Sequence, residues 1–438
     1  MDIMTRTQPI GWRLYRLGQL FEERKEKVSD KDFPPLSVTM QGIVPQLETA
    51  AKTDDGDNRK LVRTSDYVIN SRSDRKGSGG ISDYDGSVSL ISIVLKPTKA
   101  IHPRFAHHLL RSPAFQEEFY RWGHGIVADL WTTRYADMKN IRLFIPDLPT
   151  QKAIADFLDR ETARIDLLIE KKQRLVERLG ESLKAVINRA TTVGFRGGKV
   201  KQTEDKWLGE VATNWRVAPL KWFVRLQSGF AFKAERFSDH GTRLVRMNNL
   251  KRGALDLENS VCVLDEDVNR SVMLCEGDII LGMSGSIGET GSLGNFAVVV
   301  KDDLPCLLNQ RVGRFQILGD EVLPDYLTLV IQSPSFLDPI FLAATSTAQF
   351  NVSPGQVGAI MFALPPTQEQ SEIVDEVAQR SIDLKRIKDL TVESIDRLRE
   401  FRAALITAAV TGQIDPETWS RRGTTDRRLD QIEAEMGA

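Results

Sequence analysis

Apolar residues recur three and four positions apart along two long stretches of the chain, with polar residues between them. In the first stretch these residues are Ile154, Leu158, Ile165, Leu168, Leu175, Leu179 and Val186. In the second, less regular stretch they are Val377, Leu384, Ile395, Leu398 and Leu405. This spacing puts apolar side chains on one side of an α-helix and is typical of a coiled-coil seam. We therefore predict two long helices whose stripes pack together, since a lone stripe would lie in water. Two separate helices that pack between domains are the alternative.

A mixed region precedes each of these predicted helices. Its short runs of β-branched and apolar residues predict strands at 66–70, 88–95, 277–281 and 296–300. Glycine-rich connections, which predict turns, lie at 76–80 and 282–294. In each region one helix start is indicated by a capping serine followed by proline, at Ser112-Pro113 and Ser333-Pro334. Each mixed region is therefore predicted to be an α/β domain.

The two halves of the chain repeat one another. GWRLYRL from Gly11 matches NWRVAPL from Asn214, and SDYVI from Ser65 matches GDIIL from Gly277. SPAF matches SPSF, IRLFIPDLPTQKAI matches IMFALPPTQEQSEI, and AVINRATTVG matches ALITAAVTG, all in the same order. Matches in one order indicate a duplicated unit. We predict α/β domains at 1–148 and 207–366, helices at 149–193 and 367–411, a linker at 194–206 and a polar tail at 412–438.

Composition is that of an ordinary globular protein and gives little sign of a partner. A chain of 438 residues is too long for a single ordinary hydrophobic core. The formal net charge is -1, and basic residues gather only locally, at 59–63, 72–76 and 243–252. No run reaches the roughly 18 apolar residues of a membrane span, and MDIMTRTQPIGW at the N-terminus lacks the apolar stretch of a signal peptide. The cysteines have no CxxC spacing and are interpreted as core thiols. We expect a cytoplasmic protein.

A motif at the two helix starts points to a family. Pro-x-x-x-x-Gln-x-x-Ile occurs twice, at Pro146, Gln151 and Ile154 and at Pro365, Gln370 and Ile373. With this repeated design, and with QKAIADFLDRETARIDLLIEKKQRL in the central helix, the chain resembles the specificity (S) subunits of type I restriction-modification systems, the HsdS family. LVRMNNLKRGAL, GDIILGMSGSIGETG and LNQRVGRF resemble segments of the target recognition domains of that family. The resemblance spans nearly the full chain.

The resemblance implies both a fold and a function. The fold is α/β with long helices: two target recognition domains separated by an antiparallel pair of long coiled-coil helices, with a pseudo-two-fold internal repeat. The implied function is sequence-specific binding of double-stranded DNA, each domain recognising one half of a bipartite, asymmetric sequence. The implied partners are methyltransferase (M) subunits, two copies in the family, and restriction/translocase (R) subunits. The first domain lacks the SGSIGETG and LNQRVGRF segments, so residue roles are not transferable between the domains.

Catalytic signatures are missing from the sequence. It has neither the Asn-Pro-Pro-aromatic nor the Phe-x-Gly-x-Gly motif of amino-methyltransferases and no GxxxxGK[ST] phosphate loop, and the GGK at 197–199 lies in a polar linker. The glycines of GMSGSIGETG lack dinucleotide-binding spacing. His107 and His108 have no metal-binding partner motif and are expected on an ordinary helix surface. We therefore expect a non-catalytic subunit with no cofactor and no metal.

Candidate DNA-binding residues follow from the chemistry of base recognition. Arg makes forked hydrogen bonds to guanine, and Asn or Gln to adenine, while Ser, Thr and backbone amides contact phosphates. In the second half these residue types gather at Arg246, Asn248, Asn249, Lys251, Arg252, Ser284, Ser286, Asn309, Gln310, Arg311, Thr347, Gln349 and Asn351. In the first half the candidates are Arg72, Arg75, Lys76, Ser78, Thr132, Thr133, Arg134 and Tyr135. For each of them a turn cap or a solvated loop residue is the alternative interpretation.

A second hypothesis comes from a different class of protein. A non-catalytic assembly scaffold would bind protein partners through the coiled-coil helices and the α/β domains, and the near-neutral net charge favours it. A stand-alone methyltransferase or nuclease is opposed by the missing motifs. DNA recognition within a type I restriction-modification complex is the leading hypothesis, because the helix motif occurs at the same place in both halves.

Overall fold

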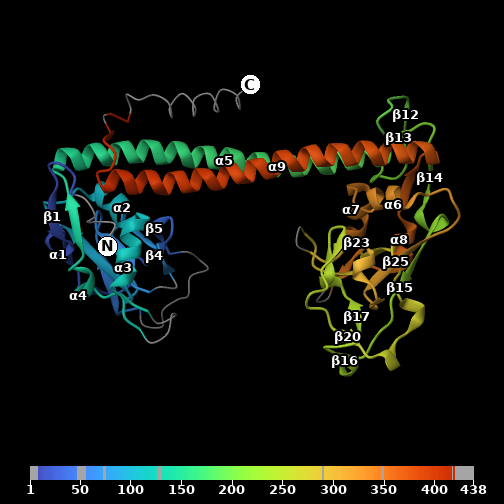
Figure 1. The fold of residues 1–438 in the computed structure, drawn as a ribbon, viewed down its shortest axis with the longest axis horizontal. Coiled ribbons are helices and arrows are strands. Elements are labelled where there is room, and N and C mark those ends of the chain that lie inside the picture. Colours follow the sequence, from blue (N-terminus) through green and yellow to red (C-terminus); the bar gives the residue numbers. More distant parts are fainter. Residues whose placement is uncertain are drawn as a thin grey trace. The chain divides into compact units, whose positions relative to one another are not determined.

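The computed structural model divides the chain into two compact units. It describes residues 8–46, 56–72, 75–125, 131–288, 291–346, 350–416 and 418–419. Unit 1 comprises Met1–Gln173 and Val392–Ala438, and unit 2 comprises Arg174–Thr391. The two long helices expected from the sequence are α5 (Leu148–Thr192) and α9 (Thr367–Val410), and each contributes residues to both units (Figure 1). The chain therefore combines mixed α/β structure with two long helices, as predicted.

A four-stranded antiparallel sheet forms the centre of the α/β part of unit 1. Its strands, in the order β2-β10-β7-β8, are Phe21–Glu23, Ser92–Pro97, Tyr67–Asn70 and Gly79–Ile81. A separate antiparallel pair joins β1 (Arg13–Arg16) to β11 (Arg142–Ile145). The strand that opens the domain thus lies beside the strand that leads into α5.

Smaller sheets and short helices complete unit 1. One sheet contains β3, β6 and β9, at Lys27–Val28, Arg59–Val62 and Gly86–Val88. A hairpin contains β4 and β5, at Leu36–Thr39 and Gly42–Pro45. The helices α1 to α4 are Leu17–Leu20, Pro103–Arg111, Pro113–Arg121 and Tyr135–Met138.

The core of unit 1 includes segments of both long helices. Ile154 and Ile165 of α5 and Leu405 of α9 lie in the same buried cluster as the domain's aromatic residues. Those aromatic residues include Phe105, Phe115 and Phe119, none of which is exposed. Beside this cluster, Asp166 of α5 forms an ion pair of 2.8 Å with Arg402 of α9. In unit 1, then, the early part of α5 packs against the late part of α9.

Unit 2 repeats the central sheet and adds a second one. The central sheet has the order β15-β25-β21-β23, with strands at Val224–Ser228, Val312–Ile317, Ile279–Gly282 and Phe296–Val298. The added sheet has the order β16-β20-β17-β24, with strands at Phe237–Ser238, Cys262–Val263, Thr242–Val245 and Cys306–Leu308. Within it β17 and β24 run parallel. This second sheet has its own buried cluster around Leu244, Val263 and Leu307.

Shorter elements of unit 2 surround these sheets. The strand pair β14·β28 joins Arg216–Pro219 to Met361–Leu364. The remaining strands β12, β13, β18, β19, β22, β26 and β27 are Val200–Gln202, Glu210–Ala212, Leu250–Lys251, Ala254–Leu255, Ser284–Gly285, Thr345–Ser346 and Phe350–Asn351. The helices α6, α7 and α8 are Pro324–Val330, Pro334–Ala343 and Pro354–Ala359.

The core of unit 2 also takes residues from both long helices. Ile187 and Ala190 of α5 share a buried cluster with Ile373 and Val377 of α9. The largest buried side chain of this cluster, Trp215, comes from the start of the domain. In unit 2, the late part of α5 therefore packs against the early part of α9.

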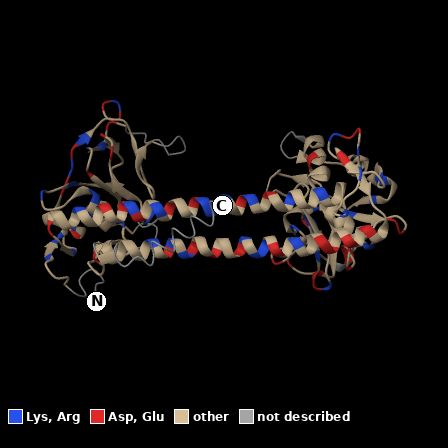
Figure 2. Cartoon of the chain, turned by 90° about the horizontal axis from the view of Figure 1, so that it is seen from above, with Lys and Arg blue, Asp and Glu red and all other residues tan. Residues whose placement is uncertain are grey.

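The apolar stripes of the long helices are not buried evenly. Ile154, Leu158, Ile165 and Leu168 of α5 are buried, as are Val377, Ile395 and Leu405 of α9. Leu175 is 36% exposed, whereas the half-buried positions are Leu179, Val186, Leu384 and Leu398. Figure 2 shows acidic and basic residues at short intervals along both helices. These charges keep the outward sides of the helices in water, although each exposed pair stabilises the fold by only about 0–1 kcal/mol.

The sequence repeat is also a repeat of topology within each unit. The pair β1·β11 corresponds to β14·β28, and the order β2-β10-β7-β8 corresponds to β15-β25-β21-β23. A tryptophan meets a glycine just after a long helix in both cases. Gly412 has a positive φ of 71°, and a Cβ there would lie 3.0 Å from the Trp12 ring. Gly194 has a φ of 69°, and a Cβ there would lie 3.0 Å from the Trp215 ring.

The glutamine of each helix-start motif is fully buried and makes the same set of hydrogen bonds. In unit 1 the Gln151 Nε2 donates to the carbonyls of Ala100 (3.1 Å) and Pro146 (2.9 Å), and Oε1 accepts from the His102 amide (2.7 Å). Each glutamine therefore ties the first turn of a long helix to the end of a strand and to the loop before another helix.

Gln370 makes the equivalent bonds in unit 2. Its Nε2 donates to the carbonyls of Glu321 (2.7 Å) and Pro365 (2.9 Å), and its Oε1 accepts from the Leu323 amide (2.8 Å). The spacing of the motif thus has a structural cause in both halves.

The structure corrects several local predictions. The run 88–95 is not one strand: β9 ends at Val88 and β10 begins at Ser92, because the exposed residues Leu90 and Ile91 form a turn between them. The predicted turn 76–80 runs into β8, and the predicted turn 282–294 contains β22. Ser112 caps α3 by accepting the Phe115 amide, but the Ser333 hydroxyl makes no such cap and donates to the Val330 carbonyl instead.

Among the described residues, no single helix has the length and apolar character needed to cross a membrane. The bent pair α6 and α7 meets that requirement only when its two helices are taken together. Tyr326, Leu327, Val330 and Phe336 of this pair are buried in the core of unit 2.

We expect replacement of Gln370 by Ala to destabilise unit 2 much more than replacement of Gln368, an exposed neighbour on the same helix turn. Loss of the Gln370 amide leaves two carbonyls and one amide of the main chain without partners, and each buried orphan costs about 1–3 kcal/mol. Hydrogen exchange at the Leu323 amide, compared between Gln370→Ala and Gln368→Ala, measures the effect. Equal protection in the two variants would show that the motif does not hold the helix start.

Candidate nucleic-acid interface

Candidate residues from separate parts of the sequence meet in unit 2. The parallel strands β17 and β24 end side by side, with Val245 opposite Leu308, and the Asn309 amide donates to the Val245 carbonyl (3.1 Å). Arg246 and the short 3-10 helix η6 (Met247–Asn249) therefore leave the sheet next to Asn309. Two groups of candidates that are far apart in sequence become neighbours through one strand pairing.

A further segment joins the same region from the other side. The Met283 amide donates to the Arg311 carbonyl (2.9 Å), which fixes the start of the 284–286 segment beside Arg311. Ser284 in turn pairs with Asn351, through the β22·β27 ladder and through a hydrogen bond between their side chains. Hydrogen bonds thus connect four candidate segments into one region of unit 2.

The exposure of each candidate separates side chains that reach solvent from those that hold the fold. Asn248, Ser286, Gln310 and Arg311 are exposed, and Arg246, Asn309 and Asn351 are half-buried. Asn249 and Ser284 are buried. The Asn249 amide accepts from the Arg246 amide (2.9 Å) and donates to the Asp256 carbonyl (2.8 Å), so its forked group is already used within the domain.

We use the name unit 2 polar patch for Arg246, Asn248, Asn309, Gln310 and Arg311. The Arg246 Nε is buried and has no hydrogen-bond partner among the residues that the structure describes. Arginine, asparagine and glutamine are the side chains that make forked hydrogen bonds to base edges. The patch therefore carries the donors and acceptors that base recognition requires, on a frame of paired strands.

Lys251 and Arg252 lie in a different feature, the tight hairpin formed by β18 and β19. Both residues are exposed, and Arg252 has a positive φ of 44°. The Arg252 amide donates to the Asn295 side chain (2.8 Å), which ties the hairpin to the strand β23 that follows. Candidates Thr347 and Gln349 lie outside the described residues.

Sequence reasoning missed one residue of this region, Phe230. Its side chain is 47% exposed. Its amide donates to the Leu308 carbonyl (3.0 Å), and its carbonyl accepts from the Gln310 amide (2.9 Å). The preceding Gly229 leaves no room for a Cβ, which would lie 2.3 Å from the Leu308 and Asn309 carbonyl oxygens. The sequence feature that could have indicated Phe230 is an aromatic residue directly after glycine in the run QSGFAF.

In unit 1 the two candidate loops also lie together. Arg72 pairs with Thr132 through an isolated β-bridge, and the Thr133 amide donates to the Ser71 carbonyl (3.0 Å). The exposed candidates are Arg72, Arg75, Lys76 and Arg134. Lys76 forms an exposed ion pair with Glu117 (2.5 Å), and its Nζ lies 5.4 Å from the centre of the Tyr120 ring.

Three other candidates of unit 1 point into the domain. Ser78 is buried, and Thr133, which has no exposure, donates its hydroxyl to the Phe119 carbonyl (2.9 Å). The Tyr135 hydroxyl donates to the Phe21 carbonyl (2.7 Å). These side chains stabilise the frame that carries the exposed arginines.

His107 and His108 do not lie on an ordinary helix surface, because α2 packs between the central sheet and α5. The His108 Nε2 lies 2.6 Å from the Asp159 carboxylate of α5. The His107 Nδ1 accepts the Ile81 amide (3.3 Å), and burial, helped by the nearby Arg111 charge, lowers the pKa of His107 to about 3. No group of three metal-ligating side chains occurs in the described part of the chain.

Comparison with known proteins identifies relatives of this chain. Residues 9–178 match the model of a family described as the type I restriction modification DNA specificity domain. The chain is 25% identical over 425 residues, 93% of either protein, to the type I restriction enzyme MjaVIII specificity subunit of Methanocaldococcus jannaschii. It is 31% identical over 183 residues to the type I restriction enzyme EcoAI specificity subunit of Escherichia coli, covering 41% of this chain and 31% of that protein.

Solved structures show the same fold. The HsdS subunit from Thermoanaerobacter tengcongensis matches with a TM-score of 0.54 and 16% identity, over 94% of this chain and 100% of that one. A chain from a structure of complex assembly and conformational transition in the type I R-M system matches with a TM-score of 0.71 and 14% identity, over 93% of this chain and 100% of that one. At these identities the likeness concerns the fold.

The low pKa of His107 predicts that unit 1 loses stability in acid. Above the ordinary pKa of about 6.5, His107 is neutral in both the folded and the unfolded chain and has no effect. As pH falls from about 6.5 toward about 3, only the unfolded chain binds the proton, and stability decreases by up to about 1.4 kcal/mol per pH unit. The variant His107→Asn, which keeps a side-chain acceptor, is expected to flatten this dependence.

The measurement is hydrogen exchange of the α2 amides between pH 6.5 and pH 4, corrected for intrinsic exchange rates. The matched control is His124→Asn, since the His124 side chain is 74% exposed. An unchanged pH dependence in His107→Asn would contradict the assignment.

Proposed function

Because this chain is a specificity subunit of the type I restriction-modification family, we propose that it selects the DNA sequence on which such an enzyme acts and carries no catalytic site itself. The MjaVIII specificity subunit matches over 93% of either protein, and the HsdS subunit from Thermoanaerobacter tengcongensis matches over 94% of this chain and 100% of its own. Particular side chains are proposed to recognise the bases. Each unit is proposed to recognise one half of a bipartite, asymmetric sequence.

The unit 2 polar patch carries this proposal. Asn248, Gln310 and Arg311 are exposed and come from segments that only the fold brings together. Because strand ends hold their main chains, these side chains are presented on a rigid frame, which accurate recognition of a base edge requires. Lys251 and Arg252, on a separate hairpin, are suited to a phosphate contact that positions the DNA without reading it.

Unit 1 supplies the second half of the proposed site. Its exposed Arg72 lies beside Thr132, and Arg134 directly precedes α4. The two units have equivalent sheets but different surface residues, which fits recognition of two unequal half-sites. We propose that α5 and α9 form an antiparallel pair with a pseudo-two-fold relation between the halves. The contacts of early α5 with late α9 in unit 1, and of late α5 with early α9 in unit 2, support it.

The long helices also offer a surface for partner subunits. Large apolar side chains with more than a third of their surface exposed include Leu167 and Leu175 of α5 and Ile382, Ile387 and Leu390 of α9. Apolar residues that gather on one exposed surface mark interaction sites, and Ile387 and Leu390 lie one helix turn apart on α9. We propose that methyltransferase subunits bind here, two in a complete enzyme, and that restriction subunits join that assembly. The solved relative from a type I R-M complex supports assembly of this kind.

A pure protein scaffold is the second candidate function. The exposed apolar residues of the helices and the net charge of -1 favour it over a protein that binds DNA unaided. The two functions differ in one measurable property, because a scaffold shows no preference among DNA sequences in any assembly.

The test starts from duplexes selected out of a random pool by the chain in complex with a methyltransferase subunit. The double variant Asn248→Ala, Gln310→Ala is expected to lose about thirtyfold or more in affinity, since each of the two forked contacts is worth about 1–3 kcal/mol. The loss should concern one half-site only, whereas Arg72→Ala should affect the other. Lys251→Ala is the control: it should weaken all sequences alike and flatten the salt dependence. Absence of any selected sequence would favour the scaffold, and equal losses at both half-sites would refute the assignment of one half-site to each unit.

The length of the helices is proposed to set the gap between the half-sites. Removing one heptad from each helix, 174–180 of α5 and 387–393 of α9, shortens the pair by about 10 Å at about 1.5 Å per residue. We expect the preferred spacer to shrink by about three base pairs at about 3.4 Å per pair. Weaker binding is also expected, because three base pairs turn the duplex by roughly a third of its helical repeat. Selection from duplexes with spacers of varied length measures the change, and an unchanged spacer in an active variant would refute the idea.

A further inference from the structure

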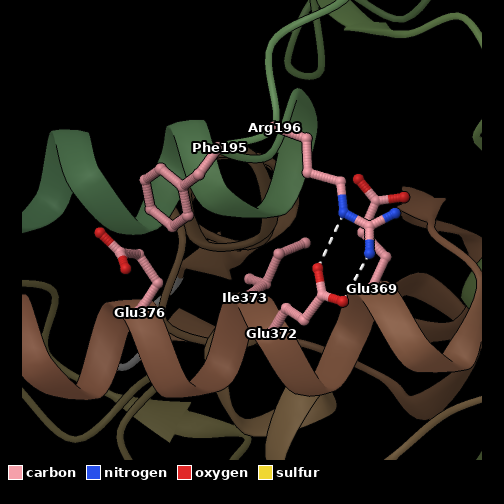
Figure 3. A pocket seen from close by; sticks show the side chains of 6 residues that line it. All are labelled: Phe195, Arg196, Glu369, Glu372, Ile373 and Glu376. Atoms are coloured by element: carbon pink, nitrogen blue, oxygen red, sulfur yellow. Dashed lines mark hydrogen bonds and ion pairs between the residues drawn. The ribbon is translucent and has the colours of Figure 1, made fainter.

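A small pocket lies in unit 2 where the chain leaves α5 and passes the beginning of α9 (Figure 3). Its volume is about 210 Å³, which is room for about seven water molecules at roughly 30 Å³ each. The residues that line it are Phe195, Arg196, Glu369, Glu372, Ile373 and Glu376. Three carboxylates thus surround a wall made by one aromatic and one aliphatic side chain.

Two of the three carboxylates already have a cation. Glu372 accepts two hydrogen bonds from Arg196, at 2.8 Å from Nε and 2.5 Å from an Nη atom. Glu376 accepts from the Nε of Arg380 (2.7 Å), whose guanidinium also lies 4.3 Å from the centre of the Phe195 ring. The two guanidinium groups at this site, those of Arg196 and Arg380, therefore form hydrogen bonds with Glu372 and Glu376.

Glu369 is the exception. It is only 5% exposed, and it has no hydrogen bond or ion pair among the residues that the structure describes. Its Oε1 lies close enough to Gly194 that a Cβ there would be 3.4 Å away, and it acts on Arg196 only through its charge. Because Glu369 has no hydrogen bond or ion pair in the described part of the chain, a cationic group that enters the pocket can contact its carboxylate directly.

The lining decides which kind of cation fits. No group of three metal-ligating side chains occurs in the described part of unit 2, so the carboxylates are not arranged for a metal ion. Phe195 and Ile373 instead offer an apolar wall between Glu376 and Glu369 (Figure 3). An apolar stem with a charged end, such as the side chain of lysine, covers apolar surface along its length and presents its ammonium group at its tip.

We propose that this pocket binds one primary alkylammonium group, with the ammonium on Glu369 and the alkyl stem against Phe195 and Ile373. The group is either the end of a lysine side chain from a partner subunit or a free amine. The proposal does not rest on DNA recognition, because no residue of the pocket belongs to the unit 2 polar patch.

The repeat shows that the site is not a requirement of the fold. Aligning Gln151 with Gln370 places residues without an acidic group at the three carboxylate positions, namely Thr150, Ala153 and Phe157. In unit 1 the Phe157 ring instead packs against Trp419, with ring centres 6.3 Å apart. The same helix start is thus closed by an aromatic contact in one unit and left as an acidic pocket in the other.

The experiment follows the Ile373 δ1-methyl resonance of the full chain during titration with n-butylammonium chloride. We expect a saturable shift with n-butylammonium and none with n-butanol or with sodium chloride at the same ionic strength. Glu369→Gln should weaken this binding about tenfold to hundredfold, the value of one charge-assisted hydrogen bond. Glu393→Gln is the matched control, because Glu393 lies on the same helix and, among the described residues, pairs with Arg397 (2.5 Å) and lies outside the pocket. It should bind n-butylammonium like the unchanged chain.

Thermal unfolding of the free variant tests whether the substitution has damaged the fold. Because the Glu369 side chain makes no hydrogen bond or ion pair among the described residues, Glu369→Gln is expected to leave the unfolding temperature of the free chain nearly unchanged. A variant that stays folded but binds n-butylammonium as tightly as the unchanged chain would overturn the proposal. Equal shifts with n-butanol, or no shift of Ile373 with n-butylammonium, would also overturn it.

Repeating the titration on the chain in complex with a methyltransferase subunit distinguishes the two sources of the amine. If a lysine of that subunit fills the pocket, Ile373 shifts on complex formation and n-butylammonium adds nothing, and Glu369→Gln weakens the complex. If a free amine is the ligand, n-butylammonium binds the complex as it binds the free chain. Either result supports an alkylammonium site, and neither depends on whether the complex selects a DNA sequence.

Discussion

A buried glutamine side chain joins each long helix to its domain, and the arrangement of each unit depends on this joint. The amide of Gln151 or Gln370 bonds at once to the end of a strand, to the loop before another helix and, through its own position, to the first turn of the long helix. A rotation of the helix would break all three bonds and leave buried groups without partners. The helix therefore has one permitted face, which directs Ile154 or Ile373, three residues further on, into the core.

Hydrogen bonds inside the domain also determine which side chains are available on the surface proposed to bind DNA. Strand ends position Arg246, Asn309 and Arg311 through main-chain bonds, so their side chains are not needed to hold the fold. Asn249 and Ser284 have the other role. Their side chains form hydrogen bonds inside the domain and fix the turns from which the exposed residues project. A recognition surface on strand ends thus needs two kinds of polar residue, one that supports and one that contacts.

Sequence periodicity was sufficient for the long helices, because the apolar spacing of Ile154, Leu158 and Ile165 has a direct counterpart in burial. It failed at 88–95, where Leu90 and Ile91 are apolar but form an exposed turn. Residue type indicated the candidate surface but not which side chains face solvent. The partner of Thr133 is Phe119 and that of His108 is Asp159, and contacts over such separations leave no local signature.

The two halves differ in what they keep and what they change. Both keep the buried glutamine, the tryptophan against a glycine and the order of the central sheet. Buried groups of this kind cannot vary freely, because every polar atom needs a partner and every side chain a space. Exposed side chains carry no such constraint. The halves accordingly differ in their exposed loops and in the pocket residues at the start of α9. A frame repeated for structural reasons, with surfaces free to diverge, suits the proposed recognition of two different half-sites.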